Sequence, residues 1–208
     1  PKIRYLGDDV PAETLAWQDP LPERDYKLIS DRDIRKLEAA IADSGLTNTQ
    51  LVSTAWASAS TYRGTDMRGG ANGARIRLAP QNRWAINNPD ALSEVLAVLE
   101  EVQDEFNSGL SRGKQVSLAD VIVLAGNVGV EQAAEAFGVE VSIPFTPGRV
   151  DAIEGSVDDT SWSVMEPRHD GFRNYMADLG FMAPSQALID KADTVSYTHL
   201  TLPTKLAV

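Results

Sequence analysis

One segment of the chain, Val121 to Ala125, is apolar in every position and lies within a longer stretch rich in alanine. A helix that is apolar all round is normally buried on every side, so other elements must pack around it. Ser117 can cap such a helix and Gly138 can end it, which places the helix at about 117 to 137. A parallel strand is the competing interpretation, but the length of the apolar and alanine-rich stretch favours a helix.

Three further segments carry apolar residues at the spacing of an amphipathic helix. Each begins with a residue that can cap it, and two of them add a capping-box partner three positions later. The expected helices are about 31 to 44 (Ser30 with Asp33, ended by Gly45), about 47 to 62 (Thr47 with Gln50) and about 89 to 107 (Asn88, then Pro89). Together with the apolar segment they predict an all-α domain.

The remaining segments predict long ordered loops. In residues 1–29, Pro11, Pro20 and Pro22 bias the residues before them away from helix, so we expect an extended arm that packs across the body. Gly64 to Trp84 is rich in glycine and predicts a loop rather than an element. After Gly138 the pattern is short and irregular, with one short helix expected near 170 to 178 and another near 184 to 192.

Composition excludes several classes of protein. The net charge of −11 makes nucleic acid an improbable partner, because such a surface repels phosphate. The chain has no cysteine, so disulfides, thiolate nucleophiles and cysteine-ligated metals are excluded. Its two histidines, His169 and His199, do not form a metal-binding motif. No apolar run is long enough to cross a membrane.

Two candidate sites each have a functional and a structural interpretation. Arg68 and Arg75 lie in the glycine-rich segment, which could bind an anion through its backbone N–H groups. The favoured interpretation is a packed loop whose arginines pair with internal carboxylates or carbonyls. His169 could be a general base or a haem ligand, but its charged neighbours favour a solvated surface residue.

Other residue types supply no catalytic constellation. Neighbouring acidic residues on a helix point apart, so Glu100 with Glu101 is a poor carboxylate pair. The serines near Ser53 lack a plausible histidine partner, which excludes a Ser-His-Asp hydrolase. Trp56 lies on an apolar helical face and is most simply a core residue. The residues alone therefore indicate no active site.

Four segments closely resemble the C-terminal domain of bacterial catalase-peroxidases, and the resemblance extends from Pro1 to about Asp193. They are PKIRYLGDDVPAETLAWQDPLP, LVSTAWASASTYRGTDMRGGANGARIRLAPQNRW, PFTPGRVDAIEG and DGFRNYMADLG. The resemblance implies an all-α, haem-peroxidase-like fold. It also implies a parent that dismutates hydrogen peroxide, oxidises peroxidase donors and serves the response to oxidative stress. In that family haem b is bound by the N-terminal domain alone.

The resemblance also implies that the peroxide chemistry is absent from this segment. The haem domain of the family carries an Arg-Met-Ala-Trp-His run, whose arginine and histidine cleave the peroxide O–O bond. Here Ser53 stands at the arginine position, Ala57 at the histidine position, and only Trp56 remains. Asn82 matches the asparagine that orients the missing histidine, and the GRVD run that starts at Gly148 similarly echoes the haem domain. We expect no catalytic, cofactor-binding or metal-binding residue in this chain.

The expected role is therefore structural. The resemblance implies that this segment docks on the haem-containing N-terminal domain of the same protein and keeps its distal pocket arranged, in a cytoplasmic homodimer. Tyr5, Leu15 and Trp17 on the arm are candidate apolar anchors for docking. Because the chain begins at Pro1 without a methionine, we expect a fragment, and a signal peptide cannot be assessed. The segment of the family that faces the iron from the proximal side lies beyond Asp193.

Two alternatives remain at this level. One is residual haem binding through His169, and the other is an acidic protein-interaction module without enzymatic context. A haem titration separates the first from the structural role, and binding to the parent's haem domain separates the second.

The expected organisation has three parts. Residues 1–29 form the arm between domains, and residues 30–193 form an incomplete peroxidase-like domain. Residues 194–208 are expected to be a non-native tail, because VSYTHLTLPT resembles translated sequencing-adapter sequence. An incomplete domain should leave the core face of the helix at about 117 to 137 uncovered and promote aggregation.

Overall fold

The computed structural model describes residues 13, 15, 18–64, 67–156, 158–170, 172–173 and 175–177. Its elements in chain order are α1 (Asp31–Ala42), α2 (Asn48–Ala59), the 3₁₀ turns η3 (Arg75–Arg77), η4 (Gln81–Arg83) and η5 (Ala85–Asn87), α3 (Pro89–Ser108), α4 (Leu118–Ala136), α5 (Asp159–Ser163), β1 (His169–Asp170) and β2 (Tyr175–Met176). The two strands are only two residues long each, so the prediction of an all-α fold with long loops is confirmed. The helix expected near 184 to 192 lies outside the described residues.

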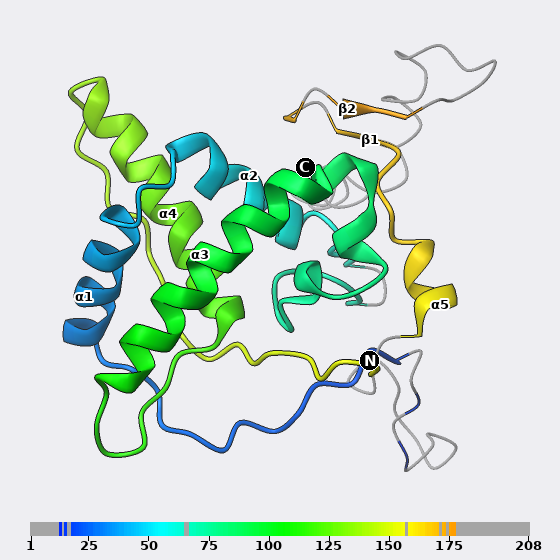
Figure 1. Cartoon of the computed structure of the whole chain (residues 1–208), viewed down its shortest axis with the longest axis horizontal. Helices are drawn as coiled ribbons and strands as arrows, with labels where there is room; N and C mark the ends of the chain where they lie inside the picture. The colour runs from blue at the N-terminus through cyan, green and yellow to red at the C-terminus, as the bar shows by residue number, and fades with distance from the viewer. Residues whose placement is uncertain are drawn as a thin grey trace, which may run out of the picture.

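Helices α1 to α4 form the larger part of the fold, which we call the helical body (Figure 1). Helix α4 contacts the other three helices. Its apolar residues Val121, Ile122, Leu124 and Ala125 are completely buried, as the sequence predicts for a helix that is apolar all round. The expectation of an uncovered core face is therefore wrong for this half of α4. Exposed large apolar residues occur in the second half of α4 and just after it, namely Val130, Phe137, Val139 and Val141.

Glycines let α4 approach α2 closely. A Cβ atom at Gly126 would lie 2.5 Å from the Cβ of Ala55, and one at Gly129 would lie 2.9 Å from Val52 Cγ2. Real Cβ atoms do not come this close to other atoms, so any larger residue would push the two helices apart. The small residues on α2 and α4 thus set the distance between them.

The capping pairs form as the sequence predicts at two helices. The Ser30 backbone N–H donates to Asp33 Oδ2 over 3.0 Å at the start of α1. Before α2, Gln50 N donates to Thr47 Oγ1 over 3.3 Å and Thr47 N donates to Gln50 Oε1 over 2.9 Å. These bonds satisfy N–H groups that have no partner inside a helix.

Other helix ends differ from expectation. Asn88 precedes α3, but its side chain makes no capping bond and its backbone is left-handed, with φ of 48°. Helices α1 and α2 end at Ala42 and Ala59, earlier than periodicity indicates, because tighter turns follow. After α2 the turn is closed by Tyr62 N, which donates to the carbonyl of Ala59 over 3.0 Å.

Two extended segments, residues 18–30 and 139–153, run along the helical body and lie side by side where Tyr26 meets Arg149 (Figure 1). The Tyr26 hydroxyl donates to the carbonyl of Arg149 over 3.2 Å, and Lys27 N donates to the carbonyl of Gly113 over 2.8 Å. Ile29 is buried in the core of the helical body. In its described part, the arm therefore packs across the body as expected.

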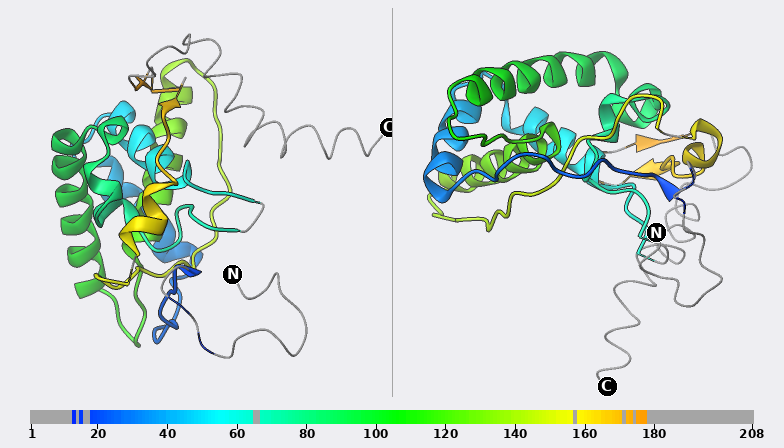
Figure 2. Two further views of the ribbon diagram at one scale, coloured as in Figure 1. Left: turned by 90° about the vertical axis from the view of Figure 1, so that its right-hand side faces the viewer. Right: turned by 90° about the horizontal axis from the view of Figure 1, so that it is seen from below.

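The described residues of 61–88 and 158–177 form a second part, which we call the polar-loop region. Its own small core consists of Trp84, Ile86, Trp162 and Met165, with Tyr175 packed against them. Helix α5, which the sequence analysis missed, and the β1–β2 pair lie at the end of the molecule away from α1 (Figure 2). Gly64 to Trp84 is an ordered loop with short 3₁₀ turns, as predicted for its described residues.

The prediction of a short helix near 170 to 178 is wrong. β1 and β2 pair antiparallel here, with His169 opposite Met176 and Asp170 opposite Tyr175. The reason is local, since Asp170 Oδ1 accepts hydrogen bonds from the backbone N–H groups of Phe172 and Arg173, over 2.9 and 3.3 Å. Such a side-chain-to-backbone turn competes with helix and reverses the chain.

Candidate functional site

The positions that the family resemblance assigns to a degenerate distal site are divided between α2 and η4. Ser53 and Ala57 both line a cavity of about 410 Å³ beside α2. Trp56 and Asn82 do not line it, although the resemblance assigns them to the same distal site. The structure therefore brings together two of the four residues singled out in the sequence.

The sequence interpretation of Trp56 as a core residue is wrong, because its side chain is not in the core. The residue is 44% exposed. Its indole Nε1 donates to Asp170 Oδ2 over 2.7 Å, and its ring centroid lies 4.9 Å from that of Phe172. The indole N–H of a tryptophan needs an acceptor. Here Trp56 on α2 finds this acceptor in Asp170, at the start of the β1–β2 turn.

Asp170 is the centre of a buried polar network. Its Oδ2 also accepts from Arg173 Nε over 2.7 Å, and Arg173 Nη1 donates to Asn87 Oδ1 over 2.7 Å. Burial by itself raises the pKa of Asp170, but the hydrogen bonds from Arg173 and Trp56 outweigh it, so the pKa lies below its ordinary value. The ionised carboxylate of Asp170 thus joins α2, η5 and the β1–β2 turn.

The sequence interpretation of His169 is also wrong. The sequence indicated a solvated surface residue, but the side chain is only 8% exposed. It lies in β1, one residue before Asp170, and the bonds of Asp170 to α2 hold β1 against the helical body. His169 does not line the cavity beside α2.

Asn82 has a local structural contact. Its Nδ2 donates to the carbonyl of Arg77 over 3.1 Å, within the same loop. The neighbouring Gln81, which the sequence analysis did not single out, reaches α2 instead. Its Nε2 donates to the carbonyl of Ala57 and its Oε1 accepts from Trp162 Nε1, each over 3.3 Å.

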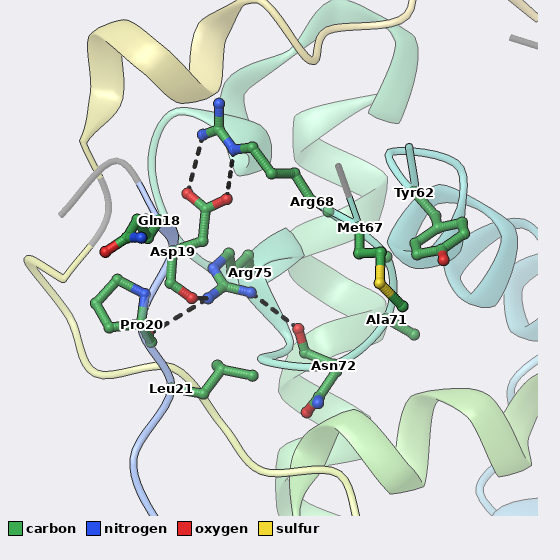
Figure 3. Close-up of a pocket in the computed structure, with 12 residues that line it drawn as sticks. Gln18, Asp19, Pro20, Leu21, Tyr62, Met67, Arg68, Ala71, Asn72 and Arg75 are labelled. Atoms are coloured by element: carbon green, nitrogen blue, oxygen red, sulfur yellow. Dashed lines mark hydrogen bonds and ion pairs between the residues drawn. The ribbon is translucent and has the colours of Figure 1, made fainter. Parts of the chain in front are cut away.

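The two arginines of the glycine-rich segment pair with internal groups, as the favoured interpretation predicts (Figure 3). Arg68 Nε and Nη2 donate to the two carboxylate oxygens of Asp19, over 2.6 and 2.9 Å. Arg75 Nη2 donates to the carbonyl of Asp19 over 2.7 Å, and Arg75 Nη1 to that of Asn72 over 3.0 Å. These bonds tie the loop to the arm, and they use donors that an anion would need.

The same arginines cover Trp162 of α5. The guanidinium carbons of Arg68 and Arg75 lie 5.8 and 5.1 Å from the centroid of its ring. Burial lowers the pKa of Arg75 while the charge of Asp19 opposes this change. The cations here act as packing partners for a fully buried aromatic ring.

The GRVD run has a structural role that its sequence did not reveal. Asp151 Oδ2 and Oδ1 accept from the backbone N–H groups of Leu118 and Ala119, each over 2.8 Å, at the positive end of α4. Arg149 Nη1 donates to the buried Asp120 Oδ1 over 2.8 Å. Three of the acceptors missed in the sequence, Asp19, Asp120 and Asp151, are far from these partners along the chain, so no local signal could have found them. Asp170 is likewise 114 positions from Trp56, although Arg173 is only three positions away.

The residues around the cavity beside α2 do not fit a haem group. Haem iron needs an axial ligand from histidine, cysteine, methionine or tyrosine. None of these residue types is among the residues that line this cavity. Within the described ranges, no group of three or more histidine and acidic residues could hold a metal ion. Nor does any helix in the described part of the chain combine the length and apolarity that a membrane span requires.

Comparisons with known proteins give the chain a family. The model of the family described as peroxidase matches residues 13–201. A catalase-peroxidase of Bradyrhizobium sp. (strain ORS 278) is 58% identical over 198 residues, which are 95% of this chain and 27% of that protein. A catalase-peroxidase of Hahella chejuensis (strain KCTC 2396) is 57% identical, with the same two coverages of 95% and 27%. The chain thus spans about a quarter of the length of these curated relatives.

Proposed function

The chain belongs to the peroxidase family, and from this premise we propose that it is the C-terminal domain of a catalase-peroxidase and has a supporting, non-catalytic role. The parent protein would dismutate hydrogen peroxide and oxidise peroxidase donors with haem b bound in its N-terminal domain. The similarity to catalase-peroxidases over 95% of the chain supports this assignment.

One observation carries the non-catalytic part of the proposal, and it concerns the two cavity residues on α2. Heterolysis of a peroxide bond needs a group that moves a proton and a cation that stabilises the developing charge. Ala57 cannot exchange a proton, and Ser53 has no charge. Trp56, the retained residue of the family run, already donates its indole N–H to Asp170.

A domain without its own chemistry acts through contact with another polypeptide. The exposed apolar residues in and after the second half of α4 (Val130, Phe137, Val139 and Val141) offer one contact surface, and Phe137 is 88% exposed. Leu15 on the arm is also exposed, whereas the other expected anchors, Tyr5 and Trp17, lie outside the described residues. An interface of about 600–1,500 Å² is enough to hold two domains together. We propose the haem domain of the same protein as this partner, in a homodimeric parent.

The test is to add the chain to the isolated haem domain of its parent and to record the haem spin state and the rate of oxygen evolution. We expect the chain to shift the spin state and to raise the catalase rate. Phe137→Asp should reduce this effect, since it places a charge on the contact surface. Val164→Asp, at another exposed apolar position in the polar-loop region, is the matched control. A haem domain that is unaffected by the unmodified chain would contradict the proposal.

A further inference from the structure

The cavity beside α2 has features of a ligand site that the supporting role does not require. Its volume is about 410 Å³, and its walls come from α2, η5, the first turns of α3 and the β1–β2 turn. The lining residues are Thr49, Gln50, Ser53, Thr54, Ala57, Ile86, Asn87, Asn88, Ala91, Leu92, Val95, Phe172 and Arg173. Small side chains at Ser53 and Ala57 leave this space open.

One buried donor in the cavity wall has no acceptor. Arg173 uses Nε for Asp170 and Nη1 for Asn87, but its Nη2 is buried without a hydrogen-bond partner in the described part of the chain. The Arg173 side chain is only 9% exposed, so bulk water does not compensate the missing bond. A charged donor left in this state is unfavourable, and an acceptor that reaches Nη2 would relieve it.

The charge around the cavity favours an anion. Arg173 is the single charged residue among those that line it. The carboxylate of Asp170 is shared among four donors, namely the side chains of Trp56 and Arg173 and the backbone N–H groups of Phe172 and Arg173. These hydrogen bonds offset much of its negative charge, and Asp170 itself does not line the cavity. A planar carboxylate matches a guanidinium donor in geometry and charge.

The rest of the wall selects an apolar body. Ile86, Leu92 and Val95 are buried apolar residues, and the ring of Phe172 is exposed at the edge of the cavity. The hydroxyl groups of Ser53 and Thr54 add hydrogen-bonding capacity on the α2 side. We propose that this cavity binds a small organic carboxylate with an apolar body, whose carboxylate accepts from Arg173 Nη2. This site does not depend on the supporting role proposed above.

The test is a titration of the 208-residue chain, labelled with ¹⁵N at tryptophan, with benzoate. Trp56 reports on the site because its indole N–H and Arg173 share Asp170, and Trp56→Phe assigns its signal. We expect a saturable shift of this signal with a Kd of about 1 mM or lower. Benzamide, which has no charge, and formate, which has no apolar body, should each bind at least about tenfold more weakly.

Two variants test the position of the site. Arg173→Gln should weaken benzoate binding by about tenfold or more through loss of the charged donor. Because that change also disturbs Asp170, Ser53→Phe provides an independent test that fills the cavity and leaves the ion pair intact. Ser53→Phe should abolish binding, whereas Ser93→Phe, at an exposed position on α3 outside this cavity, should not change it.

Three outcomes would overturn the proposal. One is the absence of a saturable Trp56 shift up to about 20 mM benzoate. Another is binding of benzamide as tight as that of benzoate, which would show that the charge does not contribute, or binding of formate as tight, which would show that the apolar wall does not contribute. The third is unchanged benzoate binding in Ser53→Phe or in Arg173→Gln.

Discussion

In the helical body the buried side chains are almost all apolar, whereas in the polar-loop region a core of four residues is surrounded by buried ions. The buried cations are Arg68 and Arg75, and the side chain of Arg173 is only 9% exposed. Arg68 pairs with the carboxylate of Asp19, and Arg173 pairs with that of Asp170. Apolar helices can pack in many ways that bury similar area, but an ion pair tolerates few geometries. The loops are therefore held in place by specific ion pairs and hydrogen bonds rather than by the size of their core.

The largest effect should follow from breaking such a pair. Asp19→Ala leaves the buried charge of Arg68 without its carboxylate and should lower the free energy of unfolding by about 3–5 kcal/mol in urea denaturation. The Lys114–Asp33 pair is the contrasting case, because Lys114 is 29% exposed. Lys114→Met should cost only about 0–1 kcal/mol. Equal costs for the two variants would remove the distinction between the regions.

A cavity in the helical body should have the next largest effect. Leu124 of α4 is completely buried, so Leu124→Ala should cost about 2–5 kcal/mol through lost apolar contacts and the remaining cavity. Val164→Ala, at an exposed apolar position, should change the free energy of unfolding by less than about 0.5 kcal/mol. A Leu124→Ala variant as stable as the unmodified chain would show that α4 is not the centre of the body.

The contact between α2 and α4 gives a sharper test of helix packing. Gly129→Ala places a Cβ against Val52 and Leu51 and should cost about 1–3 kcal/mol in thermal or urea unfolding. Gly109 follows α3 with a helical φ, and the nearest atom to an added Cβ lies 3.5 Å away. Gly109→Ala should therefore be neutral or stabilising by up to about 1 kcal/mol. If both variants behave alike, close approach does not limit this interface.

The smallest effect concerns the pH dependence of the polar-loop region. The pKa of Asp170 is lower in the folded chain than its ordinary value of about 3.9, so the unfolded chain binds more protons. Asp170 therefore stabilises the fold above about pH 4, and this contribution is lost as the pH falls through the folded pKa. Asp170→Asn should flatten the acid limb of a plot of unfolding free energy against pH. A variant profile parallel to that of the unmodified chain would contradict this role.

Periodicity and capping chemistry were sufficient to predict the helical body. The four long helices, the burial of Val121, Ile122, Leu124 and Ala125, and the capping pair of Thr47 with Gln50 depend on residues within a few positions of one another. The internal pairing of Arg68 and Arg75 could also be predicted, because buried arginines need acceptors. The identity of the acceptor could not, since Asp19 lies 49 positions from Arg68.

Two residues were misjudged for a similar reason. Trp56 has the spacing of a core residue, but its acceptor Asp170 lies 114 positions away in a strand that periodicity cannot detect. His169 has charged neighbours that indicate a surface position, yet Asp170 holds its strand against α2. The Asp170 turn that replaces the expected helix also depends on two local hydrogen bonds that helix propensity ignores.

We propose above that this chain acts through contact with another polypeptide and performs no peroxide chemistry of its own. The most direct measurement is a titration of the purified chain with haemin, followed by oxygen evolution from hydrogen peroxide. We predict the spectrum of free haemin and no oxygen evolution above a haemin blank. A stoichiometric Soret band that is lost in His169→Ala, together with oxygen evolution from peroxide, would contradict the account.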